Sequence, residues 1–564
     1  LSNSIGSLRC SHGDICTGAA RRRTGRDVAT AGASHRAPIR MANHLVGVEG
    51  HPMTSLAENL RPTTVRRSLF CIVFLLLSYW VHFWPTFHAA NESIRLYFVQ
   101  AVVDYGSASV DEPRQRYGMT NVDKAHYQGH DYMDKAPGLS LLVVPVYWIA
   151  TRIFGMSTDF PDLPNLSYLL LLFGVVIPGT LGAYAVYRII RSRAGPSKAV
   201  EEAALFGAII VGLASPYALY CTLFFGHGPA AAFGAMSIAM LDRQRYVAGM
   251  LAGTMVLVDT PTAVLAFGLG IWVLIRTRSF RAMIEFGIGG IPPVAIQLAY
   301  NTWLFDSPFT FAYAHKASGD LATIHAQGLF GFSIPTIERL YGLSFGSERG
   351  LFFHAPVLLL AFFGGPRAKP FLVLSLVYFL WIAAFVDWQA GASYTPRHLT
   401  PIVPLLATAA ALSLLQKPKL RVVAPALLVY SALVTFSMIS TFPYAMIPFD
   451  APILEQALPM LGSGAISPNI LGLTSYLALL PPIGLAVLLC GLLRVRRSLI
   501  AGFVGLACFL MLAAAPVPLT SAAKIDSLTR ATAFNGYAPV AKNICHSHNG
   551  YRWIERAWAC VPKR

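Results

Sequence analysis

Long apolar runs, separated by short basic or polar segments, follow one another along most of the sequence. A helix needs about 20 mostly apolar residues to cross the hydrocarbon core of a bilayer, and many of the runs are close to that length. We therefore predict membrane-spanning helices rather than the core of a soluble domain. The thirteen predicted spans cover approximately 68–87, 166–190, 202–223, 228–241, 246–259, 261–276, 282–304, 351–364, 369–386, 399–415, 422–441, 473–493 and 498–516.

The composition agrees with this pattern. Of 564 residues, 55% are hydrophobic and only 13% are charged, and the mean hydropathy is +0.54. Soluble globular proteins carry about 25% charged residues. The composition excludes an ordinary cytosolic enzyme and a disordered protein, and we predict an all-α polytopic membrane protein.

The net charge of +17 has two interpretations, nucleic-acid binding and membrane topology. The basic residues lie in short clusters between apolar runs, and the sequence contains no zinc finger, RNA-recognition motif or other nucleic-acid module. We therefore predict no nucleic-acid partner, and the basic clusters indicate cytoplasmic loops under the positive-inside rule. These loops are 191–198, 243–245, 276–281, 367–369, 417–421 and 494–497.

The short apolar segment 138–154, which contains Pro145, decides the topology. If it crossed the membrane, the basic loop 191–198 would lie outside, against the positive-inside rule. We therefore place this segment at the outer membrane interface, with the N-terminus inside and the C-terminus outside. Every long polar loop then faces the extracytoplasmic side: 88–137, 305–350, 387–398, 442–472 and the tail after residue 516.

The two ends of the chain differ from the central membrane domain, 68–516. Residues 1–67 are basic and begin with a stretch that lacks apolar periodicity. We predict a disordered tail or sequence translated upstream of the true start, with a transit peptide as the alternative. Residues 517–564 are predicted to form a short extracytoplasmic tail. In an extracytoplasmic compartment Cys545 and Cys560 could form a disulfide, and the sequence alone leaves open whether they pair.

The outer loop 88–137 holds seven of the 27 acidic residues. Carboxylates at a membrane edge lose part of their hydration, which is costly and usually functional. Glu92 directly follows the first span, where a partly desolvated carboxylate can act as a general base. Alternatively, Glu92 caps the helix that apolar periodicity predicts over 94–105, an amphipathic helix lying on the membrane. The residues alone leave both interpretations open.

A series of short motifs runs through the predicted outer segments. They are Asn91-Glu92, DKAPG at 134–138, FGH at 225–227, YNxxxFxSPF at 300–309, ERGLxFHxP at 348–356 and WxxGxSYxPRH at 388–398. In these motifs and their order, the chain resembles the integral-membrane GT-C glycosyltransferases, in the branch of protein O-mannosyltransferases and aminoarabinose transferases. The resemblance covers most of residues 68–400.

The resemblance implies many membrane helices with interfacial helices in the first outer loop. It implies a glycosyltransferase of the bacterial inner or plasma membrane, which moves a hexose or pentose with inversion from a polyprenyl-phosphate donor to an acceptor hydroxyl. The partners are then the donor, membrane lipids and a protein, lipid or glycan acceptor that the sequence does not identify. Neither a cofactor nor a metal is required. His126, His130 and Asp131, in a segment typical of a loop, form the alternative, a zinc or manganese site.

The expected site residues fall into three groups. Relatives typically carry Asp-Glu where this chain has Asn91-Glu92, so Glu92 is the expected base, with Asp123 or Asp104 as substitutes. Cations are expected to hold the leaving phosphate, and the candidates are Lys135, Arg349, Arg397 and His398. Substrate contacts are expected from Asn91, His227, Trp388 and Tyr394. The alternative for these cations and aromatic residues is an anchoring role at helix ends or in the aromatic belt.

Two other classes of function stay open. Transporters and lipid flippases place ionisable residues near the bilayer midplane, whereas the middle parts of these spans carry almost no charge and no internal repeat is evident. A polysaccharide ligase shares the lipid-phosphate donor but joins longer glycans. An assay that compares a polyprenyl-phosphate monosaccharide with a lipid-diphosphate oligosaccharide distinguishes the two enzymatic classes.

We expect a single cysteine at the position of Arg193 to be inaccessible from outside the cell, because the loop 191–198 is predicted to be cytoplasmic. Labelling of intact cells with a membrane-impermeant maleimide measures this, in a chain whose free cysteines are replaced by serine. A cysteine at Ser463, in the predicted outer loop 442–472, is the positive control. Labelling of the Arg193 position from outside would overturn the topology.

Overall fold

The structure is a computed structural model. It describes residues 89–117, 123–159, 161–317, 331–447, 449–469, 471–485, 499–514, 519, 521–534, 541–543, 545, 551–554 and 559–562. The predicted tail 1–67, the first predicted span 68–87 and the basic loop 494–497 lie outside these residues.

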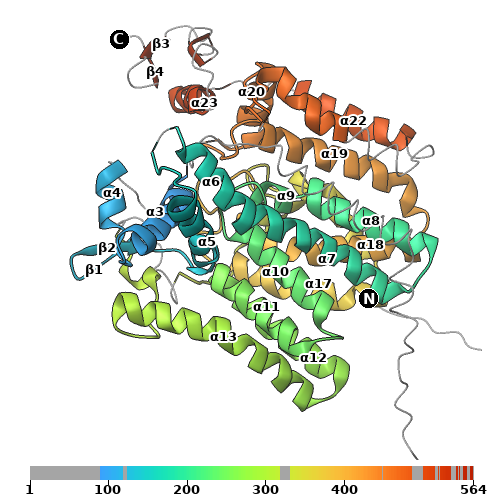
Figure 1. Cartoon of the computed structure of the whole chain (residues 1–564). Helices are drawn as coiled ribbons and strands as arrows, with labels where there is room; N and C mark the ends of the chain where they lie inside the picture. The colour runs from blue at the N-terminus through green and yellow to red at the C-terminus, as the bar shows by residue number, and fades with distance from the viewer. Residues whose placement is uncertain are drawn as a thin grey trace, which may run out of the picture. The chain divides into compact units, whose positions relative to one another are not determined.

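Helices dominate the described part of the chain. Six of them are long and apolar enough to cross a membrane: Leu163–Ala194, Thr260–Thr277, Phe280–Phe305, Gly365–Ala383, Arg397–Gln416 and Leu420–Ser440. Shorter apolar helices lie at Gly138–Ile153, Arg245–Val258, Ser475–Leu485 and Gly502–Met511. All of them lie on apolar segments identified in the sequence, and the chain is an all-α polytopic membrane protein, as predicted (Figure 1).

The elements follow one another in the order shown by the labels of Figure 1. The first half contains α3 (Ala90–Asp104), α4 (Asp111–Tyr117), β1 (Lys124–Tyr127), β2 (His130–Met133), α5 (Gly138–Trp148), α6 (Leu163–Leu171), α7 (Ile177–Ala194), α8 (Lys198–Leu213), α9 (Pro216–Tyr220), α10 (His227–Met240), α11 (Arg245–Val258), α12 (Ala263–Thr277) and α13 (Phe280–Phe305). The second half contains α15 (Ile337–Ser344), α16 (Leu351–His354), α17 (Gly365–Ala383), α18 (Val403–Gln416), α19 (Leu420–Ser440), α20 (Leu458–Gly462), α22 (Leu499–Ala514), α23 (Ala522–Phe534), β3 (Tyr551–Ile554) and β4 (Ala559–Pro562). Short 3-10 or π segments, labelled η, are η1 (Ile149–Ile153), η2 (Leu172–Val176), η3 (Thr260–Thr262), η4 (Ala312–His315), η5 (Pro356–Phe363), η6 (Arg397–Ile402), η7 (Ile453–Ala457) and η8 (Ser475–Leu479).

Close backbone contact joins α11 to α13, while α10 packs against both α7 and α11 (Figure 1). A Cβ atom on Gly249 of α11 would lie 1.8 Å from the Phe286 carbonyl oxygen, and one on Gly289 of α13 would lie 2.0 Å from that of Tyr246. Lipid tails are as apolar as leucine, so helices in a membrane associate largely through close packing of small residues. The two glycines therefore set the distance between these helices.

Three of the loops predicted to face the cytoplasm come together. The Asp242 carboxylate lies 3.8 Å from the Arg193 guanidinium and 3.0 Å from that of Arg276. The Arg193 guanidinium also lies 5.0 Å from the ring centroid of Trp272. The structure thus confirms that these loops share one end of the bundle, and the side of the membrane stays a prediction.

Helix α3 confirms the predicted helix over 94–105, but the predicted amphipathic pattern is wrong. All residues from 91 to 101 are buried. Ile94 and Phe98 join a cluster with Tyr300, whereas Val99 belongs to the main core. Polar side chains tolerate this burial because they are paired: the Arg95 guanidinium donates to the Asn91 side chain at 3.1 Å and to the Ala136 carbonyl at 3.0 Å.

The predicted span 351–364 is not a single α-helix. Helix α16 ends at His354, and the 3-10 helix η5 begins at Pro356. Proline has no backbone N–H and disfavours the α conformation in the residue before it, here Ala355 with φ −137° and ψ 67°. Eight residues of 3-10 helix extend about 16 Å, well short of the roughly 30 Å hydrocarbon core.

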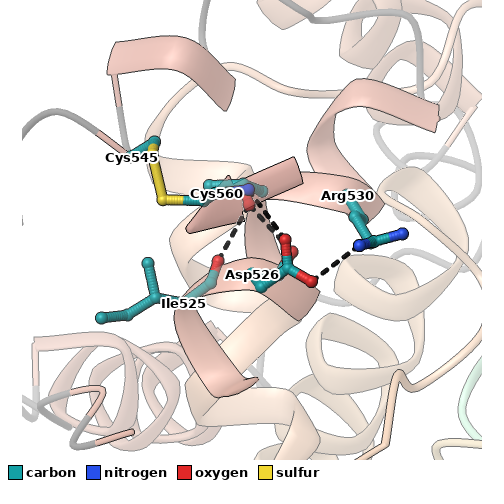
Figure 2. The surroundings of a disulfide bond; sticks show 6 residues. Ile525, Asp526, Arg530, Cys545 and Cys560 are labelled. Carbon is teal, nitrogen blue, oxygen red and sulfur yellow. Dashed lines mark hydrogen bonds and ion pairs between the residues drawn. A yellow bond between two sulfur atoms is a disulfide. The ribbon is translucent and has the colours of Figure 1, made fainter. Parts of the chain in front are cut away.

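The described C-terminal segments form a small module, which we define as α23 with the hairpin β3–β4. Cys545 and Cys560, whose pairing the sequence left open, form a disulfide (Figure 2). Asp526 on α23 accepts a hydrogen bond from the Cys560 backbone N–H at 2.8 Å. The Ser527 hydroxyl donates to the Ile447 carbonyl at 3.0 Å, so the module lies against the predicted outer loop 442–472.

We expect Gly249→Leu to destabilise the protein by about 3 kcal/mol or more, because a side chain there meets the α13 backbone. Gly287→Leu is the matched control, since a Cβ at Gly287 has nothing within 4 Å. Thermal unfolding in detergent measures the difference. Equal unfolding midpoints for the two variants would contradict the close approach of α11 and α13.

Candidate functional site

A cavity of about 890 Å³ lies between segments that are far apart in the sequence. Its walls come from the start of α12, the segment 309–316 after α13, the end of α17 and the first residues of η6. Most of the lining is apolar or aromatic and includes Val264, Phe309, Phe311, Phe332, Trp381 and Phe385. Lys135, Lys316, Asp387, Arg397 and His398 supply polar groups to the same cavity. Three loops predicted to be extracytoplasmic, 88–137, 305–350 and 387–398, therefore converge on this cavity.

Two lysines share the carboxylates of the first of these loops. Lys135 Nζ lies 3.1 Å from Asp123 Oδ1 and 3.2 Å from Asp134 Oδ1, and Lys316 Nζ lies 3.4 Å from Asp134 Oδ2. Burial lowers the pKa of Lys135, but the two carboxylates outweigh burial and raise that pKa above its ordinary value. Burial raises the pKa of Asp123, but Lys135 and Arg397 outweigh it and bring the pKa below its ordinary value. Lys135 and Asp123 are therefore both held in their charged forms.

Arg397 and His398 enter the cavity from the start of η6. The Arg397 guanidinium lies over the Phe225 ring, 5.5 Å from its centroid, and Arg397 Nε has no hydrogen-bond partner within the described part of the chain. The His398 ring packs edge-on against His227 at a centroid distance of 5.1 Å. The ring contact with Phe225 is a cation–π geometry that fixes the guanidinium without occupying its N–H groups. Arg397 is therefore held in place while its Nε–H group stays available to donate a hydrogen bond to a ligand.

Glu92 lies in the first turn of α3 and is 2% exposed. Its Oε1 accepts from the Phe224 backbone N–H at 2.8 Å, and its Oε2 accepts from the Tyr444 hydroxyl. Burial raises the pKa of Glu92 from its ordinary value to about 7, although hydrogen bonds from Tyr444, Phe224 and Ala89 and the charge of Arg95 act in the opposite direction. The Ala89 contact means that Glu92 caps α3, and the role of Glu92 as a base stays a prediction.

Two aromatic side chains connect Glu92 to a cation of the cavity. The Phe225 ring centroid lies 6.2 Å from that of Tyr444, the partner of Glu92, and the Arg397 guanidinium lies over the same Phe225 ring. Glu92 itself is not among the described residues that line the cavity. The Tyr444 and Phe225 rings therefore form a series of contacts from the Glu92 carboxylate to the Arg397 guanidinium.

His227, the first residue of α10, forms a buried pair with Asp259 at the end of α11. The distance from His227 Nδ1 to Asp259 Oδ2 is 2.8 Å, and both residues are less than 10% exposed. Asp259 directly precedes Thr260 and Pro261, which line the cavity. Asn91, also expected at the site, accepts a hydrogen bond from Arg95 and supports α3.

Arg349 makes main-chain contacts instead of lining the cavity. Its Nε and Nη2 each donate over 2.8 Å, to the carbonyl oxygens of Gln389 and Gly391, and Nη1 donates to the Glu348 carbonyl at 3.1 Å. The residue is 3% exposed. These contacts hold the segment 388–391, and they leave the guanidinium little capacity to bind a phosphate.

The other expected residues are also placed away from the cavity lining. Trp388 packs so closely on Gly342 that a Cβ there would lie 2.3 Å from the indole. The Tyr394 hydroxyl accepts from Gln456 Nε2 at 2.6 Å. Asp104, at the far end of α3 from Glu92, accepts from the Tyr147 hydroxyl at 2.5 Å and pairs with Arg152 at 3.0 Å.

The alternative metal site has a different geometry from a helical ligand pair. His126 lies on β1 and His130 on β2, in a hairpin where His126 is opposite Asp131. His126 pairs with Asp131 at 2.9 Å, and His130 pairs with Asp111 at 2.8 Å. Within the described residues, no group of three or more His, Cys, Asp or Glu side chains is arranged to hold a metal ion.

Four residues at or near the site were not singled out by the sequence analysis: Arg95, Asp259, Lys316 and Tyr444. Lys316 and Tyr444 lie in long polar loops outside the quoted motifs, so no local signal distinguishes them. Asp259 ends an otherwise apolar run, and a lone carboxylate at such a position is a usable signal.

Comparison with known structures finds helical arrangements similar to this one. ArnT from Cupriavidus metallidurans in the apo state matches with a TM-score of 0.43 and 14% identity, over 85% of this chain and 77% of ArnT. ArnT from the same organism bound to undecaprenyl phosphate matches with a TM-score of 0.44 and 13% identity, over 87% of this chain and 78% of ArnT. No family model and no curated protein matches the chain. This degree of similarity assigns no chemistry, and the resemblance to the GT-C glycosyltransferases continues to rest on the motifs.

Proposed function

We propose that the chain is a glycosyltransferase that moves a sugar from a polyprenyl-phosphate donor to an acceptor hydroxyl on the extracytoplasmic face of the membrane. The observation that carries the proposal is the cavity in which Lys135 and Arg397 accompany a wall of aromatic and aliphatic side chains. A ligand that matches both parts has an anionic head and a long apolar body. A polyprenyl phosphate has both, and the family motifs point to the same donor.

The cations of the cavity offer donors to an anion. Lys135, Lys316 and Arg397 bring three positive charges, which Asp123, Asp134 and the lining residue Asp387 balance in number, but Arg397 Nε has no hydrogen-bond partner within the described residues. Lys135 and Arg397 both act on the Asp123 carboxylate, so the two cations lie near one another. A phosphate between them gains charge-assisted hydrogen bonds from the ammonium and from the guanidinium.

Glu92 is the proposed base. The acceptor oxygen attacks the anomeric carbon of the sugar, and the bond from that carbon to the phosphate oxygen breaks. The lipid phosphate leaves with the bonding electrons, and Glu92 takes the proton from the acceptor hydroxyl. A carboxylate oxygen has two lone pairs, so Glu92 Oε2 can accept from Tyr444 and from the acceptor at once. A single displacement of this kind inverts the anomeric centre.

The cations stabilise the leaving group of this displacement. A lipid phosphate is acidic enough to leave without a proton, but the negative charge that it gains must be stabilised. Lys135 and Arg397 are fixed in place by Asp123 and by the Phe225 ring, so this stabilisation requires little rearrangement. In the proposed reaction, Lys135 and Arg397 supply the positive charge at the leaving group, and the donor is not a nucleotide sugar.

Replacing either cation should weaken binding of undecaprenyl phosphate. We expect Lys135→Ala or Arg397→Ala to raise the Kd about 10- to 100-fold, because each removes a hydrogen bond to a charged group worth roughly 1.5–3 kcal/mol. Native mass spectrometry of the detergent-solubilised protein measures the bound lipid. Arg281→Ala is the control, since the Arg281 side chain is 89% exposed at the other end of the bundle and should leave the Kd unchanged.

Equal affinities of the Lys135→Ala, Arg397→Ala and Arg281→Ala variants for undecaprenyl phosphate would show that its phosphate does not bind in this cavity. Competition with a lipid-diphosphate oligosaccharide provides a second comparison. If that compound binds and supports transfer while the polyprenyl-phosphate monosaccharides do not, the chain is a polysaccharide ligase.

We expect Glu92→Gln to reduce sugar transfer by about 100-fold or more, because it removes the proton acceptor. The base must be ionised, and its pKa is raised to about 7, so wild-type transfer should increase as the pH rises through 7. Transfer of radiolabel from polyprenyl-phosphate sugars into membranes that contain the chain measures both effects. Glu112→Gln, an exposed change in the same outer loop, is the control. Normal transfer by Glu92→Gln would exclude Glu92 as the base.

A further inference from the structure

We propose that Tyr444 is a positioning residue for Glu92, and that the C-terminal module keeps Tyr444 in place through the loop 444–456. This inference rests on the proposed function, because it takes Glu92 as the base. It extends that function by assigning a role to a segment more than 400 positions further along the chain.

The contact at the site is the hydrogen bond from the Tyr444 hydroxyl to Glu92 Oε2. Tyr444 is 5% exposed, and its ring packs against Phe442 at a centroid distance of 5.2 Å and against Phe225. The other Glu92 oxygen is held by a backbone N–H that belongs to a different part of the chain. Tyr444 is thus the side-chain hydroxyl that fixes the direction of the carboxylate.

The backbone of Tyr444 is held by Gln456. Gln456 Nε2 donates to the Tyr444 carbonyl at 2.7 Å, and Gln456 Oε1 accepts from the Met446 N–H at 2.9 Å. The same Nε2 also donates to the Tyr394 hydroxyl at 2.6 Å. Because Gln456 is fully buried, loss of these bonds would leave polar groups unpaired in the interior. Both ends of the Tyr444 loop are therefore joined through one amide.

The neighbouring residue, Glu455, connects this loop to the C-terminal module. Glu455 Oε2 accepts from the backbone N–H groups of Asp450 and Ala451, each at 2.8 Å. Glu455 Oε1 lies 2.5 Å from Lys524 Nζ, which also lies 2.7 Å from Asp450 Oδ2. Lys524 is on α23, so the module contacts the loop with a cation that two carboxylates share.

Contacts inside the module hold Lys524 in a fixed position. The disulfide between Cys545 and Cys560 closes it, and Asp526 ties Cys560 to α23 through the backbone N–H of Cys560 (Figure 2). Asp526 also binds Arg530 at 2.7 Å within the same helix. Every step from the disulfide to Glu92 is thus a direct bond or contact between side chains and backbone.

The charged and polar groups around Glu92 determine the sign of the expected pH effect. Arg95 on the same helix, the N–H groups of Ala89 and Phe224, and the Tyr444 hydroxyl all favour the ionised carboxylate. Removing the Tyr444 hydroxyl leaves the other three in place. The pKa of Glu92 must then rise, and the pH at which the base becomes active must rise with it.

The decisive experiment measures the titration of Glu92 in the full-length protein by infrared spectroscopy. The carboxyl band that Glu92→Gln abolishes identifies the residue, so this readout does not depend on transfer activity. We expect Tyr444→Phe to move the midpoint upward by about one pH unit, and to move the acid limb of the transfer profile in the same direction. Tyr378→Phe is the matched control, because the buried Tyr378 hydroxyl has no hydrogen-bond partner within the described residues.

The role of the C-terminal module is tested in the same way. Lys524→Met should shift the midpoint in the same direction by a smaller amount, and Lys524→Arg should restore it. Arg530→Ala, a change on α23 that breaks only an ion pair inside the module, should have no effect. The Kd for undecaprenyl phosphate should stay unchanged in all of these variants.

The possible results distinguish this inference from the proposed function. An unshifted Glu92 midpoint in Tyr444→Phe overturns the positioning role, whether or not the chain transfers sugar. A shift in Tyr444→Phe without one in Lys524→Met overturns the role of the module. Normal transfer by Glu92→Gln overturns the proposed base, and the spectroscopic test of the Tyr444 contact still gives its own answer.

Discussion

A charge that is removed from water must find a partner, and this constraint organises the whole site. The chain buries Glu92, Arg95, Lys135 and Asp134 in a protein that is otherwise mostly apolar. Glu92, Arg95 and Asp134 are paired with groups from distant segments, and Lys135 is paired within its own loop, so these contacts hold loops together where apolar packing between helices does not reach. Arg397 departs from this pattern, because its Nε has no partner in the described structure. That departure is what makes the cavity suitable for an anion.

Most of the fold could be predicted because the same sequence pattern recurs along the chain. Apolar runs of nearly constant length specify helices, and the basic clusters between them specify which loops share an end of the bundle. The ion pairs of Asp242 with Arg193 and Arg276 show that this grouping is real. The predictions of individual helices fail where a local sequence pattern does not show how neighbouring segments pack or where a helix is interrupted. The periodicity of α3 suggests one buried face, but other segments cover its second face as well. Pro356 interrupts a run that looks continuous in hydropathy.

The site was predictable only in part, for a related reason. Lys135, Arg397 and His398 lie in short motifs, and the structure brings them to one cavity. Arg349 lies in a motif of the same kind, yet backbone carbonyls that no sequence pattern reveals occupy its guanidinium. Tyr444 and Lys316 act through contacts with residues far away in the chain, and neither carries a local signature. A motif therefore identifies a residue type at a position, whereas its role depends on which partners the fold supplies.

The covalent crosslink near the end of the described chain has a consequence for biogenesis. Disulfides form outside the reducing cytosol, so under the predicted topology Cys545 and Cys560 join only after that segment has been exported. Ribosomes add about 5–20 residues per second, which places the synthesis of Lys524 roughly 20–90 s after that of Glu92. During this interval the membrane helices can insert while the carboxylate still lacks its final support. If the chain has the proposed function, the oxidative folding machinery of the cell envelope would complete its maturation, and sugar transfer would begin late in assembly.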